Sequence, residues 1–254
     1  MPQKPAAVNH GRGRRVMRFA RNHPLALLLA VEAFAIFALA PLIELGLVAQ
    51  VILPATFSLL LLAAMYAAIG GKRVRRGLLV LGALLVPLEL WRYVGASAPV
   101  LLLHFFGMAL FFVVVSLTLA RAVFTSRTIR MDQVLGGVLL YLNIGLTFAF
   151  IYALLDHLGP GALQLPTPAP ERPLHASYFL YFSFVTLTTV GYGDTLPISA
   201  AARATATLEA AIGQLYPAII LARLVSIEVS QRDRRQAERE RAERDGGGVS
   251  SGKG

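Results

Sequence analysis

Long apolar runs alternate with short polar segments along the chain. Six runs are each long enough, or nearly so, to cross about 30 Å of hydrocarbon as a helix, and a seventh at 175–188 is too short. The pattern therefore predicts an all-α membrane protein with six transmembrane helices and a short re-entrant helix between the fifth and the sixth. The predicted spans are 24–42, 47–70, 77–94, 98–122, 134–156 and 201–228.

Positive charge lies on one side of these predicted spans. The first connector, around Glu44, has no lysine or arginine, whereas the second, "GGKRVRRG", carries four basic residues. The basic N-terminal segment 1–23, the connector after the fourth run and the arginine-rich tail 230–254 fall on the same side as the second connector. Because basic loops face the cytoplasm, we expect a multi-pass protein of the plasma or inner cell membrane with both termini inside.

Residues 1–40 have an alternative interpretation as a signal peptide. A basic region there precedes an apolar run that ends in Ala38-Leu39-Ala40. We favour a retained first span, because Glu32 interrupts the run and Pro41 follows the small residues. Removal of this segment would also spoil the alternation of charge.

The composition agrees with a membrane protein. Hydrophobic residues make up 56% of the 254 residues and the mean hydropathy is +0.63, which is more apolar surface than one soluble domain of this length can hide. The net charge of +10 gathers between the apolar runs, as membrane orientation requires, rather than indicating nucleic-acid binding. Because the chain has no cysteine, disulfides, thiolate metal sites and a cysteine nucleophile are excluded.

The stretch "TLTTVGYGD" at 186–194 differs from its apolar surroundings. Gly191 and Gly193 flank Tyr192, and glycine adopts positive φ without steric cost, so residues 189–193 can alternate between left- and right-handed conformations. Successive carbonyl groups can then point to the same side. At membrane depth such unpaired carbonyls are tolerated only where they line a path for water or ions, so we expect a cation to satisfy them.

Thr189-Val190-Gly191-Tyr192-Gly193, followed by Asp194, resembles the selectivity-filter signature of the potassium-channel superfamily. The resemblance implies a homotetramer in lipid, in which the carbonyls of Thr189, Val190, Gly191 and Tyr192 and the Thr189 hydroxyl coordinate K⁺. It also implies a pore domain at 134–229, with an outer helix, a pore helix, the filter and an inner helix. Permeant K⁺ would be the metal ion, and no other cofactor, small-molecule substrate or nucleic-acid partner is expected.

Some residues that would support this filter depart from the family pattern. Many members have a tryptophan pair in the pore helix where this chain has Tyr181 and Phe182. Some have a glutamate behind the filter where it has Val185. The support of the filter is therefore expected to differ from that of these members.

Hydrogen bonds that replace this support can be predicted. We expect Tyr181 to donate a hydrogen bond to Asp194. We also expect Thr186 of a neighbouring chain to serve as the partner of the Tyr192 hydroxyl, because Phe182 has no polar atom to offer. Upstream, Ser177 is the predicted N-cap of the pore helix.

The last predicted span carries residues that suit an inner helix. Gly213 is either a gating hinge or a point of close helix packing, and the sequence leaves both interpretations open. Pro217 predicts a bend, because it removes one helical hydrogen bond. When the last span is aligned with the inner helix of the channels that the chain resembles, the expected cavity-lining residues are Gln214, Pro217, Leu221 and Ala222.

Glu209 is a carboxylate within the same span and lies four residues before Gly213. A charge at membrane depth is costly and is by default a candidate functional group. The structural alternative is a protonated or hydrogen-bonded side chain behind the pore helix. Both interpretations stay open.

The first four spans, 24–122, resemble the sensor domain of voltage-gated channels without its arginines. In the fourth span, 98–120, His104 is the only ionisable side chain, so little voltage dependence is expected. We expect His104 to be simply packed, and a short interfacial linker at 123–133. Other charged side chains are expected near the outer face or paired within the domain: Glu32, Glu44, Glu89 and Arg92.

The tail 230–254 is predicted to be helical at first, with a possible ion pair between Glu240 and Arg244, and disordered at its end.

Three other functions are considered. The altered aromatics would permit a poorly selective cation channel, and a potassium-transporter subunit would reuse the filter, although such transporters resemble four fused pore units. A membrane enzyme is not expected, because the polar residues in the spans have no spacing that catalysis requires.

Overall fold

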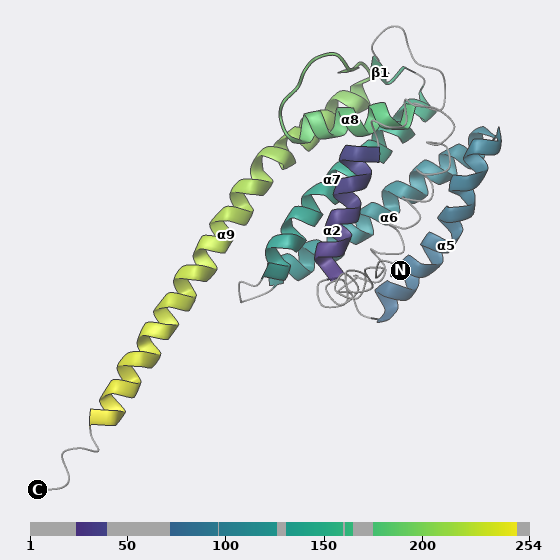
Figure 1. The fold of residues 1–254 in the computed structure, drawn as a ribbon. Coiled ribbons are helices and arrows are strands. Elements are labelled where there is room, and N and C mark those ends of the chain that lie inside the picture. Colours follow the sequence, from purple (N-terminus) through teal and green to yellow (C-terminus); the bar gives the residue numbers. More distant parts are fainter. Residues whose placement is uncertain are drawn as a thin grey trace, which may run out of the picture.

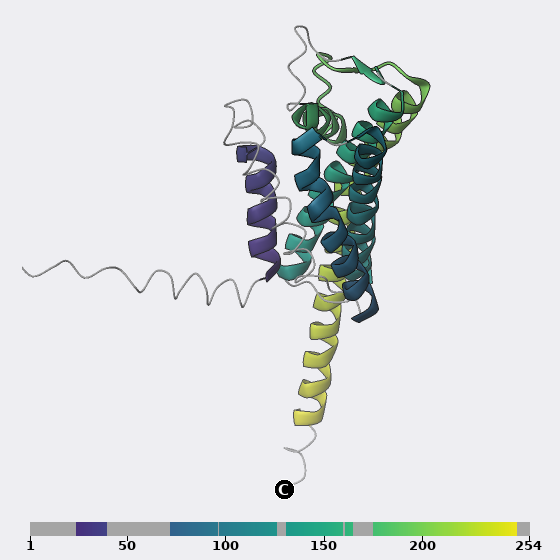
Figure 2. The same cartoon turned by 90° about the vertical axis from the view of Figure 1, so that its right-hand side faces the viewer.

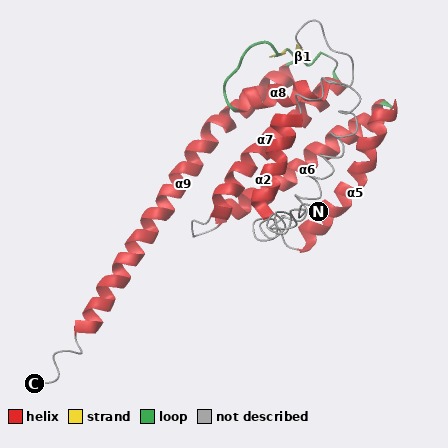
Figure 3. Cartoon of the chain, in the orientation of Figure 1, coloured by secondary structure: helices red, strands yellow, loops and turns green. Residues whose placement is uncertain are grey.

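The computed structural model describes residues 24–39, 72–95, 97–125, 131–159, 161–164 and 175–247. These residues are helical almost throughout, as Figure 3 shows. The helices are α2 (Pro24–Phe34), a π-helical turn η1 (Ala35–Leu39), α5 (Lys72–Gly95), α6 (Ala98–Thr125), α7 (Met131–Leu158), α8 (His175–Leu187) and α9 (Ala200–Gly247). Two short strands, β1 (Leu163–Gln164) and β2 (Leu196–Pro197), complete the list of described elements.

Among the described residues, three helices are long and apolar enough to cross a membrane. They are Ala98–Thr125, Gln133–Leu158 and Ala200–Glu238. The predicted first span is helical from Pro24 to Leu39, and the predicted second span, 47–70, lies outside the described residues. The mostly helical fold with several apolar helices is therefore the one expected of a membrane protein.

Several helix boundaries differ from the predicted ones. α5 begins at Lys72, so much of the predicted basic connector belongs to this helix, and α6 continues to Thr125. α7 begins at Met131, which leaves only 126–130 of the predicted linker outside the helices and outside the described residues. The apolar pattern marks only the lipid-facing stretch, whereas a helix continues wherever neighbouring polar residues have good helix propensity.

The longest such difference is at the C-terminus. α9 runs without interruption from Ala200 to Gly247, so the last span and the charged tail form one helix, and residues 248–254 lie outside the described part. Pro217 lies inside α9 and does not end it. The side chains of Glu240 and Arg244 are not described, but Glu228 and Arg232 form an ion pair of 3.0 Å at the same spacing.

α7 is the central helix of the bundle. It packs against α6, α2, α8 and α9, while α5 packs on the far side of α6 (Figure 1). His157, near the end of α7, contacts the carbonyl oxygen of Ala98 at the start of α6 (2.9 Å), so these two helices run antiparallel. Figure 2 shows the C-terminal part of α9 extending alone beyond the other helices.

Polar contacts of two carboxylates, Glu32 and Glu89, are buried within the bundle. Asn143 on α7 donates a hydrogen bond to Glu32 on α2 (2.8 Å), and His104 Nε2 lies 2.9 Å from Glu89 Oε2 on α5. The predicted pairing within the four-helix domain is confirmed for Glu89, which lies against His104 of α6, whereas the partner of Glu32 is on α7, in the predicted pore domain. His104 is buried, as predicted, with this carboxylate beside its ring. A buried carboxylate is costly without a polar partner, and only the folded bundle reveals which partner each one has. Glu44 and the side chain of Arg92 lie outside the described part.

The connections at one end of the bundle position α8. Backbone amides of Gly161 and Ala162 donate to Asp156 Oδ1 at 3.2 Å and 3.1 Å, and Gly161 has φ +87°, which glycine adopts readily. β1 and β2 then pair as antiparallel strands. The Ser199 side chain accepts a hydrogen bond from the amide of Ala202 (3.1 Å), as the N-cap of α9.

Candidate functional site

The end of α8 leads directly into the stretch 188–194. The amides of Val190 and Gly191 donate to the Val185 carbonyl at 3.0 Å and 3.3 Å, and the amide of Thr189 donates to the Thr186 carbonyl at 2.9 Å. These bonds satisfy carbonyls that the end of a helix otherwise leaves unpaired. The backbone N–H groups at the start of the stretch therefore face α8, and the carbonyls of the stretch take no part in these bonds.

Positive φ recurs at every second residue of this stretch. The φ angles are 59° at Thr189, 57° at Gly191 and 79° at Gly193. Positive φ is uncommon for a β-branched residue such as threonine, so its presence at Thr189 marks a constrained backbone. The alternation of conformations predicted from the two glycines is therefore present, and Thr189 takes part in it.

The carbonyls of this stretch are available for binding. Among the described residues, no hydrogen bond reaches the carbonyl oxygens of Thr189, Val190, Gly191 or Tyr192. All residues from Thr188 to Asp194 are exposed on the single chain, with Tyr192 70% exposed. A backbone whose first N–H groups, at 189–191, are used and whose carbonyls at 189–192 are free suits the coordination of a cation without its water shell.

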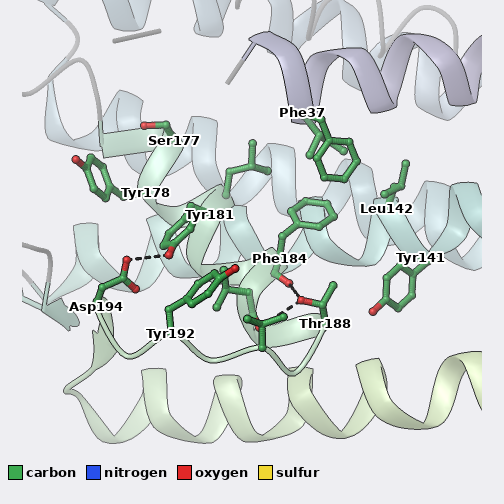
Figure 4. Close-up of a pocket in the computed structure, with 14 residues that line it drawn as sticks. Phe37, Tyr141, Leu142, Ser177, Tyr178, Tyr181, Phe184, Thr188, Tyr192 and Asp194 are labelled. Atoms are coloured by element: carbon green, nitrogen blue, oxygen red, sulfur yellow. Dashed lines mark hydrogen bonds between the residues drawn. The ribbon is translucent and has the colours of Figure 1, made fainter. Parts of the chain in front are cut away.

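The side of the stretch facing α8 is held by two tyrosines and an aspartate (Figure 4). Tyr181 donates a hydrogen bond to Asp194 Oδ2 (2.8 Å), which is the predicted contact. The rings of Tyr181 and Tyr192 are stacked, with centroids 6.4 Å apart and an angle of 3° between their planes. Asp194 Oδ1 also accepts a hydrogen bond from the amide of Thr195 (2.9 Å), so both carboxylate oxygens are used.

Within the described residues, the other predicted support residues make no hydrogen bond or ring contact with Tyr192. Phe182 is buried and packs edge-on against Tyr152 of α7, with centroids 4.8 Å apart. The Val185 and Thr186 side chains are half-buried, and the proposed contact of Thr186 with a neighbouring chain stays a prediction. Ser177 is the third residue of α8, not its N-cap, because the helix begins at His175.

A groove runs beside these residues, between η1, α7 and α8, with a volume of about 710 Å³ (Figure 4). Its apolar part includes Phe37 and Phe184, whose rings meet edge-on at 6.0 Å. Its other end reaches the side chains of Tyr192 and Asp194. The groove therefore borders the candidate site from the side of the first span.

α9 passes directly behind the end of α8 at Gly213. A Cβ atom at this position would lie 1.8 Å from the carbonyl oxygen of Leu187 and 2.7 Å from its carbonyl carbon. The same carbonyl accepts a hydrogen bond from the Tyr141 hydroxyl (3.1 Å). Of the two interpretations of Gly213, close packing therefore has direct geometric support.

Glu209 lies one turn before Gly213 and is fully buried. Tyr152 donates a hydrogen bond to its Oε2 (2.6 Å), and Ser183 Oγ lies 2.5 Å from its Oε1. This arrangement agrees with the structural alternative, a hydrogen-bonded carboxyl group behind the pore helix. Sequence reasoning singled out neither Ser183 nor Tyr152, although each places a hydroxyl in an apolar helix.

The remaining candidate residues lie on the exposed side of α9. Gln214, Pro217, Leu221 and Ala222 are all exposed or half-buried on the single chain, and Leu221 is 64% exposed. No group of three or more histidine, aspartate or glutamate side chains that could hold a metal ion occurs in the described part of the chain.

Comparison with known proteins finds similarity in this region. Residues 139–229, which contain most of α7, all of α8, the stretch 188–194 and the apolar part of α9, match the family model described as ion channel. This part of the chain is therefore similar to an ion-channel domain. The chain is also similar to protein LctB of Bacillus caldotenax, with 40% identity over 88 residues. That alignment covers 34% of this chain and 64% of LctB, and both findings agree with the predicted resemblance to the potassium-channel superfamily.

Proposed function

We propose that the protein is a potassium-selective channel in which four copies of the chain surround one pore. The observation that carries this proposal is the backbone of 189–193, with φ positive at Thr189, Gly191 and Gly193 and with free carbonyls between them. Rings of such carbonyls can replace the hydration shell of K⁺. The Thr189 hydroxyl would complete the innermost site, and conduction would be passive, without covalent chemistry.

Four copies are proposed because one strand presents its carbonyls to one side only and cannot surround an ion. α9 supports this proposal, since only 6% of its apolar window is buried in the single chain, compared with 61% for α7. In the assembled channel, α8 would be a re-entrant helix, because its 13 residues span only about 20 Å. The Thr186 side chain of a neighbouring chain would then contact Tyr192.

Weak voltage dependence belongs to the same proposal. α6 carries no row of arginines, and its buried His104 lies against Glu89 rather than standing alone as a mobile charge. Charges that move little within the membrane field transfer little energy to gating. We place both termini in the cytoplasm and the chain in the plasma or inner membrane, from the distribution of basic residues.

Flux into liposomes tests the proposal. The purified protein is expected to carry K⁺ much faster than Na⁺, and Gly191→Ala is expected to abolish this flux because alanine disfavours φ of +57°. Gly161→Ala is the matched control, since Gly161 also has positive φ and a Cβ atom added to either glycine would meet no atom within 4 Å. Equal loss of flux in both variants, or Gly191→Ala flux like that of wild type, would contradict the role of the filter.

A poorly selective cation channel is the second candidate. The observation that favours it is the placement of Phe182 against Tyr152, which leaves Tyr192 with ring stacking but no hydrogen-bond partner within the described residues. A filter with fewer polar supports can relax and admit Na⁺. Reversal potentials under K⁺ and Na⁺ gradients separate the two candidates, because a relaxed filter gives nearly equal permeabilities.

A further inference from the structure

Three helices meet at a buried polar cluster behind the filter, made of Glu209 on α9, Ser183 on α8, and Tyr152 with the Gly145 carbonyl on α7. Ser183 Oγ lies 2.7 Å from the Gly145 oxygen and 2.5 Å from Glu209 Oε1, and Tyr152 Oη lies 2.6 Å from Glu209 Oε2. Ser183 and Glu209 are fully buried. Each of the three oxygen pairs is therefore at hydrogen-bonding distance and removed from bulk water.

The number of hydrogens in this cluster determines the protonation of Glu209. Three short oxygen–oxygen contacts need three hydrogens, but the hydroxyls of Ser183 and Tyr152 supply only two. The Gly145 carbonyl cannot donate, so Ser183 must donate its one hydrogen to this carbonyl or leave two acceptor oxygens facing each other. A proton on Glu209 Oε1, donated to Ser183 Oγ, completes the set.

The charges around the cluster agree with a neutral acid. Tyr152 and Tyr141 on α7 are the titratable groups that face Glu209, and α8 contributes only the Ser183 hydroxyl. No ion pair to Glu209 occurs among the described residues. An ionised carboxylate without a cation would be costly in such a site, whereas a protonated one is fully hydrogen-bonded.

We infer that Glu209 is protonated at neutral pH and that its proton joins the inner helix α9 to the pore helix α8, so that conduction depends on this proton. Ser183 lies two residues before Val185, whose carbonyl holds the amides of Val190 and Gly191. Loss of the proton would place a carboxylate beside an acceptor oxygen and push α8 away from α9. The part of this inference that concerns conduction rests on the proposed potassium channel.

Infrared difference spectroscopy tests the protonation directly. The spectrum of wild type minus that of Glu209→Gln is expected to contain the C=O band of a protonated carboxyl group at neutral pH. Glu228→Gln, on the same helix but exposed, is the matched control and is expected to give only carboxylate bands. A carboxylate band from Glu209 would overturn the inference.

A second variant keeps this test decisive if Glu209→Gln does not fold. Ser183→Ala leaves Glu209 in place and removes the oxygen that accepts its proton, so the carboxyl band is expected to shift in frequency. Ser230→Ala is its control, because Ser230 donates to the Ser226 carbonyl of its own helix (2.9 Å). A protonated band that Ser183→Ala leaves unchanged would show that the proton is not shared with Ser183.

Potassium flux as a function of pH tests the dependence of conduction. As the pH is raised from neutral, wild-type flux is expected to fall at least five-fold, and Glu209→Gln is expected to remove this fall because glutamine donates to Ser183 and does not ionise. Glu228→Gln should keep the wild-type profile. Identical profiles for wild type and Glu209→Gln would overturn the coupling. Absence of flux at every pH would instead contradict the proposed channel, and the infrared result would still decide the protonation.

Discussion

The Cα atom of Gly213 packs directly against the backbone of Leu187, and this contact makes the residue sensitive to any side chain. A methyl group there would lie 1.8 Å from a carbonyl oxygen, and a backbone oxygen cannot move aside as a flexible side chain can. Overpacking typically costs about 1–3 kcal/mol. We therefore expect Gly213→Ala to lose roughly 3 kcal/mol of stability, measured by thermal unfolding in nanodiscs, together with most K⁺ flux.

Gly137→Ala is the matched control for this substitution. Gly137 is also a buried helical glycine, but its added methyl would have its nearest neighbour, the Tyr216 hydroxyl, at 3.7 Å. This is ordinary van der Waals contact, and alanine has a better helix propensity by about 1 kcal/mol. If Gly213→Ala changed gating while stability stayed at the level of Gly137→Ala, the hinge interpretation would replace the packing one.

The hydrogen bond between Tyr181 and Asp194 is the second residue-scale feature that can be tested. It ties α8 to the end of the stretch 188–194 over 2.8 Å. Hydrogen bonds to charged groups contribute about 1.5–3 kcal/mol when buried, and less at this exposed site. Tyr181→Phe is expected to keep the fold and to lower the ratio of K⁺ to Na⁺ permeability several-fold, measured from reversal potentials.

Asp194→Asn is the companion variant, because its amide oxygen can still accept the hydrogen bond from Tyr181. It is expected to lose less selectivity than Tyr181→Phe. A Tyr181→Phe channel with unchanged selectivity would mean that ring stacking on Tyr192 alone supports the filter.

The sequence predicted contacts between residues that are close along the chain better than contacts between residues that are far apart. The positive φ angles follow from two glycines, and Tyr181 and Asp194 are only 13 residues apart. Ser183 and Tyr152 are 26 and 57 residues from Glu209, and their approach depends on how α7, α8 and α9 pack. The sequence therefore left the roles of Glu209 and Gly213 open, because both are decided by tertiary contacts.

At the scale of helices, Arg223 joins α9 to the end of α6. Its guanidinium donates a hydrogen bond to the Phe124 carbonyl and lies 5.4 Å from the centre of the Phe124 ring. A cation near the last carbonyls of a helix is favourable, and a cation–π contact adds about 0.5–1 kcal/mol at exposed sites. Arg223→Met is therefore expected to lower the free energy of unfolding by about 1–2 kcal/mol. The melting temperature should fall accordingly.

Arg232→Met is the control for that change. Arg232 is 72% exposed and pairs only along its own helix with Glu228, an arrangement that contributes about 0.3–0.5 kcal/mol. Arg223→Lys, which keeps the charge but not the planar group, should fall between wild type and Arg223→Met. Equal melting temperatures for Arg223→Met and Arg232→Met would show that α6 and α9 are not joined through this residue.

Helix type was more predictable than helix length. Apolar runs located α6, α7, α8 and the first part of α9, because membrane-length stretches of leucine, valine and phenylalanine are distinctive. They gave no sign that α5 begins within the basic connector, and the helix predicted for the tail was not expected to be continuous with the last span, as it is in α9. Those extensions consist largely of arginine, glutamate, glutamine and alanine, which favour helix without any apolar pattern.

At the scale of the whole molecule, the single chain leaves an apolar face of α9 uncovered. Exposed residues there include Leu208, Leu215, Ile219, Leu221, Val225 and Val229. Residues 188–194 are exposed as well. In the proposed tetramer both surfaces would be covered by further copies of the chain around one axis, with the α9 helices toward the centre and α5 at the periphery.

Because the chain has no cysteine, this arrangement can be tested by cross-linking introduced cysteines without a background reaction from native ones. A single cysteine at position 221 replaces a residue that is 64% exposed on α9, and Leu84→Cys replaces one that is 60% exposed on α5. With a short thiol-reactive cross-linker in native membranes, we expect Leu221→Cys to give dimers on denaturing gels and Leu84→Cys to stay monomeric. Adding excess cysteine-free chain during expression should reduce the fraction of cross-linked dimers, because most neighbours of a Leu221→Cys chain in an assembly then have no cysteine to react. Monomers for both variants, with a monomeric mass in native mass spectrometry, would contradict a central α9 and with it the tetrameric pore.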